Sequence, residues 1–401
     1  MIRELVFHVG DPKTGTSSIQ QAMHERAWHC ESVSVAVQKE LNASTLANSL
    51  RPRPKALTKK RRKQELASKR RWVAETEADL GIISAEFFSF VRPKRLQRVL
   101  GRHFPDQADN TRIIAYVRPH ADFVLSSYAQ ILKCGYFPQS LAEYCAYMQA
   151  EGSLPFTPRF DRWRKVFARN FILRPFVRSE LRDGDVVADF FHVVLRGAAF
   201  ELSPLPPVNE SLSLEELAGI RVVQATVREE GLPSYLHIPI GGAIGWLLAG
   251  KEGRSRNRLQ IDQANAEQIR ATFMQDAYAL DAGHFDKPLF AKALDKAVEK
   301  AVPQAPSLMA EDHFPESEIR ELQALTAGIA DLLKQRPTVW RRDYMRRIGQ
   351  ISEEDFPLPG PADRKHIEAV WKLFEDVTCI LAASGEAKMQ KEPESGKETG
   401  H

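Results

Sequence analysis

The sequence predicts a three-layer α/β fold, with a parallel central sheet flanked by helices and a helical C-terminal extension. Short apolar runs occur at residues 5–9, 80–84 and 112–117, and a weaker one, interrupted by Pro175, at 170–177. Helical patterns separate these runs, at residues 15–28, 121–133 and 141–149. Continuous apolar strands that alternate with helices are typical of a parallel sheet covered on both faces.

The second half of the chain is predicted to be almost wholly helical. Helical patterns cover residues 213–228, 262–282 and 289–302. Two apolar stripes with helical spacing follow, which we expect to face a core. The stripes are Ile319, Leu322, Leu325, Ile329, Leu332 and Leu333, then Ile367, Val370, Trp371, Phe374, Val377 and Ile380. Residues 385–401 contain almost no apolar side chain, which predicts a disordered tail.

The composition is that of a globular protein, because 43% of the 401 residues are hydrophobic and 27% are charged. Residues 1–10 lack the features of a signal peptide, and no stretch is long and apolar enough to be a transmembrane segment. The four cysteines show no Cys-x-x-Cys spacing and are expected to be reduced thiols. These features predict a soluble, cytoplasmic protein.

Positive charge is concentrated in residues 51–71, the basic segment from Arg51 to Arg71. It contains eleven Lys or Arg residues and a single acid, Glu65, so it carries +10, whereas the rest of the chain carries −6. We expect an anionic partner to meet this segment, although a solvated basic helix face is an equally simple explanation. No signature of a nucleic-acid-binding fold accompanies it, so nucleic acid is not an expected partner.

Residues 7–20, FHVGDPKTGTSSIQ, predict an anion-binding loop between a strand and a helix. Gly10 opens the loop and Gly15 precedes the helix, and both permit a close approach of the backbone to a ligand. Successive backbone N–H groups and the helix N-terminus then form a cradle for phosphate. Lys13 precedes Gly15, whereas the lysine of a Walker A loop follows the second glycine. The hydroxyl groups available in this loop are those of Thr14, Thr16, Ser17 and Ser18.

A second segment, residues 116–128, reads YVRPHADFVLSSY and places Arg118 at a strand end and Ser126 in the following helix. Arginine offers a planar fork of donors, and the serine hydroxyl adds another, which suits a dianionic phosphate. Together the two segments resemble the family of sulfotransferases that use 3′-phosphoadenosine-5′-phosphosulfate (PAPS). In that family the loop holds the 5′-phosphosulfate, and an arginine and a serine hold the 3′-phosphate. His8 and Gln20 resemble the bacterial carbohydrate-type members.

The resemblance covers residues 5–290 and implies a P-loop-like fold. It implies a sulfotransferase domain over residues 1–302, with a PAPS-binding core at about 1–200 and a helical acceptor-side region at about 201–302. Residues 303–384 would form the helical extension. The implied activity is sulfuryl transfer from PAPS to a hydroxyl of a carbohydrate or glycolipid, without a metal. The implied cofactor-binding residues are Gly10, Lys13, Thr14, Gly15, Thr16, Ser17, Ser18, Arg118 and Ser126.

Two residues are candidates for catalysis. Lys13 would stabilise charge on the bridging oxygen, as its counterpart does in the family. Glu86 follows the apolar run 80–84, which places it at the carboxyl edge of the sheet, and its flanking phenylalanines should raise its pKa toward that of a general base. A glutamate of similar context serves as base in glycosaminoglycan sulfotransferases. A purely structural glutamate is the alternative.

Other family members use histidine as the base, so His24, His103 and His120 are alternative candidates. His8 lies in a predicted buried strand and is expected to be a hydrogen-bonded core residue. Two other functions are compatible with the sequence: a P-loop kinase, and a non-catalytic protein that binds nucleotide or polyanion. The position of Lys13 disfavours the kinase.

Overall fold

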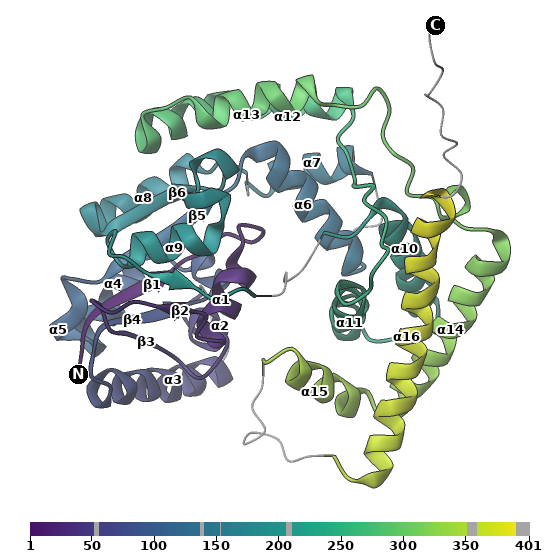
Figure 1. Cartoon of the computed structure of the whole chain (residues 1–401), viewed down its shortest axis with the longest axis horizontal. Helices are drawn as coiled ribbons and strands as arrows, with labels where there is room; N and C mark the ends of the chain where they lie inside the picture. The colour runs from purple at the N-terminus through teal and green to yellow at the C-terminus, as the bar shows by residue number, and fades with distance from the viewer. Residues whose placement is uncertain (52–55, 137–139, 153, 206–210, 351–358, 390–401) are drawn as a thin grey trace, which may run out of the picture. The chain divides into compact units, whose positions relative to one another are not determined.

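The computed structural model describes residues 1–51, 56–136, 140–152, 154–205, 211–350 and 359–389. The chain divides into two compact units (Figure 1), each assembled from three separate stretches of sequence. The first unit comprises Met1–Val124, Cys145–Val208 and Ala266–Lys300. The second comprises Leu125–Tyr144, Asn209–Asn265 and Ala301–His401. The chain passes between the units close to the boundaries predicted near residues 200 and 302, but Asn209–Asn265 belongs with the stretch after Lys300.

A five-stranded sheet in the order β3-β4-β1-β5-β6 forms the centre of the first unit. Every pairing in it is parallel, which confirms the predicted fold class. Only β3 was not predicted, because three residues are too few to show a pattern. The strands are β1 (Ile2–His8), β3 (Val35–Val37), β4 (Ala78–Ser84), β5 (Arg112–Val117) and β6 (Phe171–Pro175), beside a small antiparallel pair, β2 (Trp28–His29) and β7 (Glu201–Leu202).

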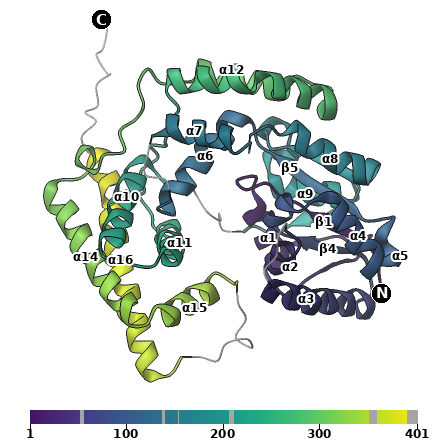
Figure 2. The ribbon, with the colours of Figure 1, turned by 180° about the vertical axis from the view of Figure 1, so that it is seen from behind.

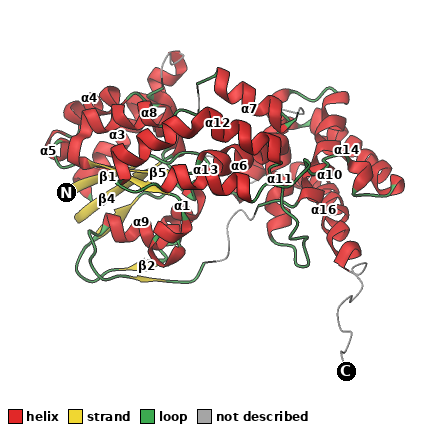
Figure 3. Ribbon diagram, turned by 90° about the horizontal axis from the view of Figure 1, so that it is seen from above, coloured by secondary structure: helices red, strands yellow, loops and turns green. Residues whose placement is uncertain are grey.

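Helices cover both faces of this sheet. Figure 3 shows α1 (Thr16–His24) and α9 (Val186–Val194) on one side and α4 (Pro93–His103) and α8 (Thr157–Phe167) on the other. On the first side Ile19, Phe190 and Phe191 pack against Val6 and Ile114 of the sheet. The remaining helices of this part are α2 (Ser44–Ser49), α3 (Ala56–Glu75), α5 (Pro105–Ala108), α7 (Leu141–Ala150), α12 (Gln263–Leu280) and α13 (Leu289–Glu299).

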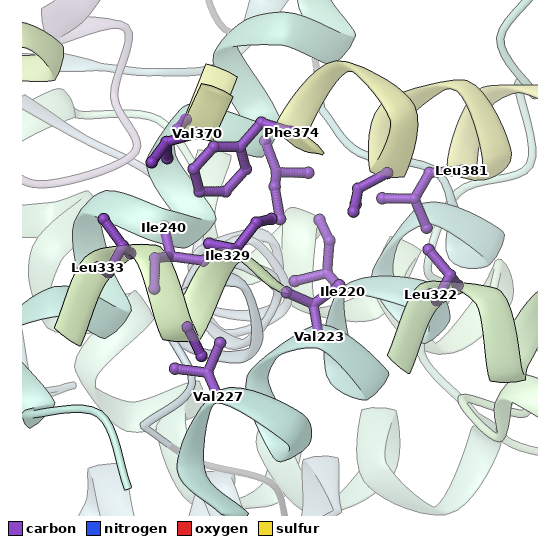
Figure 4. Packing of buried hydrophobic residues seen from close by; sticks show 14 of the residues in the cluster. Ile220, Val223, Val227, Ile240, Leu322, Ile329, Leu333, Val370, Phe374 and Leu381 are labelled. Atoms are coloured by element: carbon purple, nitrogen blue, oxygen red, sulfur yellow. The ribbon is translucent and has the colours of Figure 1, made fainter. Parts of the chain in front are cut away.

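The second unit is helical. Its helices are α6 (His120–Lys133), which begins in the first unit, α10 (Leu214–Glu229), α11 (His237–Ala249), α14 (Glu316–Gln335), α15 (Pro337–Arg347) and α16 (Pro361–Met389). The predicted stripes of α14 and α16 form its core, as Figure 4 shows for Ile329 and Phe374. They pack against α10 and α11, which supply Val223 and Ile240. Two apolar stripes need apolar partners, and this shared core explains why α10 and α11 belong to the same unit as the helices after Lys300.

The last helix, α16, continues to Met389. Residues 385–389 were expected to belong to a disordered tail and are helical, in keeping with a run of strong helix formers. Residues 390–401 lie outside the described part of the chain. Within the described part, no helix has the length and apolar character that crossing a membrane requires.

Candidate functional site

The predicted phosphate loop connects β1 to α1 at the carboxyl edge of the sheet. Pairing of β1 with β5 extends one residue beyond the strand, because the Val9 N–H donates to the Ile114 carbonyl oxygen at 2.8 Å. Gly10 then lies against α1, where a Cβ would come within 2.3 Å of Thr16 Oγ1. Gly15 caps the helix with φ at +76°, and a Cβ there would meet Val186 at 2.7 Å. Both predicted glycines are therefore required by the local packing and backbone.

The loop also holds a strained residue at its centre. Lys13 has φ at +67°, in the left-handed region that residues with a side chain seldom adopt. The Thr14 hydroxyl donates to the Asp11 carbonyl oxygen at 2.6 Å, so it shapes the loop from within. The first N–H groups of α1 lack partners within the helix, which gives this end its affinity for anions.

A buried hydroxyl at the start of α1 has no hydrogen-bond partner among the described residues. Thr16 is 1% exposed, and its Oγ1 forms no hydrogen bond with any described residue. Ser17 and Ser18 follow it on the same turn and are half-buried. An unsatisfied buried polar atom is costly unless a ligand or water completes it. The loop thus fits a phosphate-bearing group by two observations, the orphaned Thr16 hydroxyl and the N–H groups at the start of α1.

Arg118 joins the second motif to this loop. Its Nη1 donates to the carbonyl oxygen of Lys13 at 3.1 Å, across 105 positions of sequence. The guanidinium also lies 5.6 Å from the ring centre of Phe176, a cation–π contact. Burial lowers the pKa of Arg118, and Asp122 partly offsets this effect. A half-buried cation beside an anion cradle is suited to a second phosphate.

Ser126 belongs to the same motif but to a different unit. It lies on α6, within the part of that helix assigned to the second unit, and is half-buried. Its position relative to the loop therefore stays a prediction.

Glu86 follows β4, the strand directly beside β1. The Ala85 N–H donates to the His8 carbonyl oxygen at 3.2 Å, which holds the two strand ends together. Burial raises the pKa of Glu86, Lys13 lowers it, and Asp11 raises it again. The charges of Lys13 and Asp11 therefore both act on the Glu86 carboxylate. A half-buried carboxylate at a strand's carboxyl edge, with its pKa influenced by the loop lysine, is equipped for proton transfer.

His8 is the last residue of β1, directly before the loop. It is fully buried, its Nδ1 lies 2.9 Å from Ser84 Oγ, and burial lowers its pKa to about 3. Gln20 Nε2 donates to the same serine hydroxyl at 3.1 Å. The predicted hydrogen-bonded core histidine is confirmed. Because it is neutral across the physiological range, His8 adds no charge to the site.

Sequence reasoning missed an ion pair beneath the loop. Asp11 is 1% exposed and pairs with Arg159 of α8. Burial raises the pKa of Asp11, while the charge and hydrogen bond of Arg159 lower it. Arg159 lies over the Phe160 ring, 4.8 Å from its centre, and its Nε has no partner among the described residues. No local signal links the two residues, which are 148 positions apart.

The alternative histidines lie elsewhere. His120 is buried, stacks 4.4 Å from the centre of Phe156, and bonds through Nε2 to Asp276 at 2.8 Å. His103 lies near arginines of α3 and α4, and His24 is exposed at the end of α1. In the described part of the chain, the interactions of these three histidines include neither the loop nor Glu86.

The basic segment falls mainly on α3. Residues 52–55, at its beginning, lie outside the described residues. From Lys60 onward its side chains are described, and most of the basic ones are exposed.

Comparison with known proteins gives little. No protein-family model and no curated protein matches the chain. Among solved structures, the chain is similar to the crystal structure of a sulfotransferase from Alicyclobacillus acidocaldarius, with a TM-score of 0.37 and 14% identity. The match covers 70% of this chain and 96% of that one. A similarity this low does not identify a function.

Proposed function

We propose that the protein is a PAPS-dependent O-sulfotransferase that acts on a carbohydrate or glycolipid in the cytoplasm. The observation that carries the proposal is the bond between Arg118 and the Lys13 carbonyl, because it joins two separately predicted phosphate-binding segments. A kinase needs one polyphosphate site, whereas PAPS presents a 5′-phosphosulfate and a 3′-phosphate. Two linked segments that each carry a cation suit the two anionic groups of PAPS better than a single polyphosphate.

In this proposal the loop binds the 5′-phosphosulfate. Backbone N–H groups of residues 13–18 and the unpartnered Thr16 hydroxyl would contact its oxygens. Arg118 and Ser126 would hold the 3′-phosphate. The proposal needs no metal, since the cation Lys13 supplies the positive charge at the leaving oxygen.

The transfer itself uses two side chains. Glu86 accepts the proton of the acceptor hydroxyl as the acceptor oxygen forms a bond to sulfur. The bond between sulfur and the bridging oxygen breaks, and Lys13 stabilises the negative charge that stays on the released 3′-phosphoadenosine 5′-phosphate. The burial that raises the pKa of Glu86 makes it a better proton acceptor than an exposed glutamate.

Calorimetry with three nucleotides tests the proposal. We expect 3′-phosphoadenosine 5′-phosphate to bind about 10–100-fold more tightly than AMP, because a charge-assisted contact to the 3′-phosphate contributes ~1.5–3 kcal/mol. Tighter binding of ATP with Mg²⁺ would favour the kinase. Transfer is then measured with ³⁵S-labelled PAPS and a library of glycans. Nucleotide binding without transfer to any acceptor would support the non-catalytic alternative.

A further inference from the structure

Helices α3 and α4 together carry a surface rich in arginine. It comprises Arg62 and Arg70 of α3, Arg92 just before α4, and Arg95, Arg98 and Arg102 of α4, and we call it the arginine surface. None of the six forms an ion pair with a described residue. Helix α4 contributes four basic residues and no acidic one. The sequence indicated only the α3 half of this surface.

The two helices bring their charges close together. Figure 2 shows both helices beside β4, and Trp72 of α3 lies against Gly81 of that strand. The pKa of His103 on α4 is lowered by burial and then by Arg70, Arg102 and Arg62, so arginines of both helices surround it. Arg95 is affected in the same way, by burial and then by Arg62, Arg98 and Arg92.

Hydrogen bonds orient some of these arginines without neutralising them. Arg95 Nη1 donates to the Arg51 carbonyl oxygen at 2.9 Å, and Arg98 Nε donates to the Lys94 carbonyl oxygen at 3.3 Å. Carbonyl oxygens carry only partial charge, so the positive charges continue to repel one another. Arg70 and Arg102 are exposed and form no hydrogen bond with a described residue.

Several arginines elsewhere in the same unit form ion pairs. Glu4 binds both Arg112 and Arg196, Arg174 is bonded to Asp189, and Arg270 to Asp295. The arginines of the arginine surface differ from these, because no described residue forms an ion pair with any of them. Like charges held together without counter-charges lower stability, and an anionic ligand relieves that repulsion.

The surface begins beside the candidate active site. Glu86 opens the short helix η1 (Glu86–Phe90), and Arg92 follows two residues after its end. Phe90 is 46% exposed, and the guanidinium of Arg51 lies 4.9 Å from its ring centre. From Arg95 to Arg102 the helix advances ~10 Å, at 1.5 Å per residue. A chain bound along α4 would thus run toward Glu86.

We propose that the arginine surface binds a linear anionic polysaccharide and that this polymer is the acceptor. The inference rests on the proposed function and narrows its acceptor class. Guanidinium groups match carboxylate and sulfate groups in geometry and charge. The exposed side chains on the described part of α3 and on α4 include no aromatic ring, which disfavours single-stranded nucleic acid, since its bases stack on such rings.

Direct binding measurements test this inference. The triple variant Arg70→Ser, Arg98→Ser, Arg102→Ser removes three exposed charges that form no ion pair with a described residue. Its matched control, Lys292→Ser, Lys296→Ser, Lys300→Ser, removes three exposed charges at α13 of the same unit. Thermal unfolding checks that both variants fold. The probes are heparin oligosaccharides, polyglucuronate, a single-stranded oligonucleotide of equal charge and neutral dextran, each at two ionic strengths.

We expect the arginine variant to bind both acidic polysaccharides on the order of 30-fold more weakly, taking about threefold for each exposed charge contact. The lysine control should stay within twofold of the parent protein, and dextran should not bind. Equal binding by the variant and the parent would overturn the inference. Tighter binding of the oligonucleotide than of either polysaccharide would also overturn it and identify a nucleic-acid surface.

Titration of 3′-phosphoadenosine 5′-phosphate separates this inference from the proposed function. The arginine variant should bind that nucleotide as the parent does, because its changes lie outside the loop. If the parent binds polysaccharide through the three arginines but does not bind the nucleotide, the sulfotransferase proposal fails. The assignment of the arginine surface as a polysaccharide-binding site is then retained. If the nucleotide binds and the polysaccharide does not, the acceptor inference fails alone.

Discussion

Replacing Glu86 by glutamine tests the central chemical step. The change keeps size and hydrogen bonding but removes the group that would accept the proton. Loss of a general base typically slows a reaction by about 10²–10⁴-fold, which raises the barrier by ~2.7–5.5 kcal/mol. Affinity for 3′-phosphoadenosine 5′-phosphate should stay within twofold, because the proposed phosphate contacts come from the loop and Arg118.

The same substitution should stabilise the protein at high pH. Burial raises the pKa of Glu86 above its ordinary value of 4.5, so the folded state retains the proton more strongly than the unfolded state. Stability is therefore lost as pH rises from 4.5 through the raised pKa. A neutral glutamine avoids that loss. The variant and the parent should unfold at similar temperatures near pH 4, and the variant should unfold at a higher temperature at pH 8.

The assay is transfer of ³⁵S from PAPS to the best acceptor, followed across pH together with thermal unfolding. In the parent, the rate should fall as pH drops through a range above 4.5, because the base must be ionised. Glu77→Gln, at an exposed glutamate just before β4, is the matched control and should change neither measurement. Turnover of the Glu86 variant within threefold of the parent would refute the assignment and return the role to a histidine.

Three further changes probe other parts of the molecule. Lys13→Ala should reduce turnover far more than nucleotide affinity, since only contacts specific to the transition state raise turnover; weakened binding with intact turnover would contradict its role. Arg118→Ala should remove the preference for 3′-phosphoadenosine 5′-phosphate over AMP, a loss of ~1.5–3 kcal/mol seen by calorimetry. Phe374→Ala should destabilise the helical unit by ~3–5 kcal/mol in denaturant titration, because its ring is fully buried in that core; an unchanged midpoint would contradict the packing.

Much of the fold could be predicted because it depends on local pattern. The run at Arg112–Val117 coincides with β5, and the stripes around Leu322 and Phe374 do form a core. The division into units could not be predicted, because it depends on which apolar faces find each other. Helices α10 and α11 pack with α14 and α16, although the sequence places them before the predicted boundary. Periodicity predicts a buried face and does not identify its partner.

The site shows the same contrast between local and distant information. The loop glycines, Lys13 and Glu86 follow predicted strands, so their meeting at one sheet edge follows from parallel topology. Asp11 does not fit that reasoning, since a carboxylate in an anion-binding loop should repel phosphate. Arg159 of α8 forms an ion pair with Asp11 and so offsets its negative charge. Burial raises the pKa of Asp11, and Asp11 in turn raises the pKa of Glu86. The ion pair of Asp11 and Arg159 therefore affects the pKa of the proposed base as well as the charge of the loop. Local sequence could identify Glu86 as a candidate base, whereas Asp11 and its partner Arg159 are 148 positions apart and no local pattern links them.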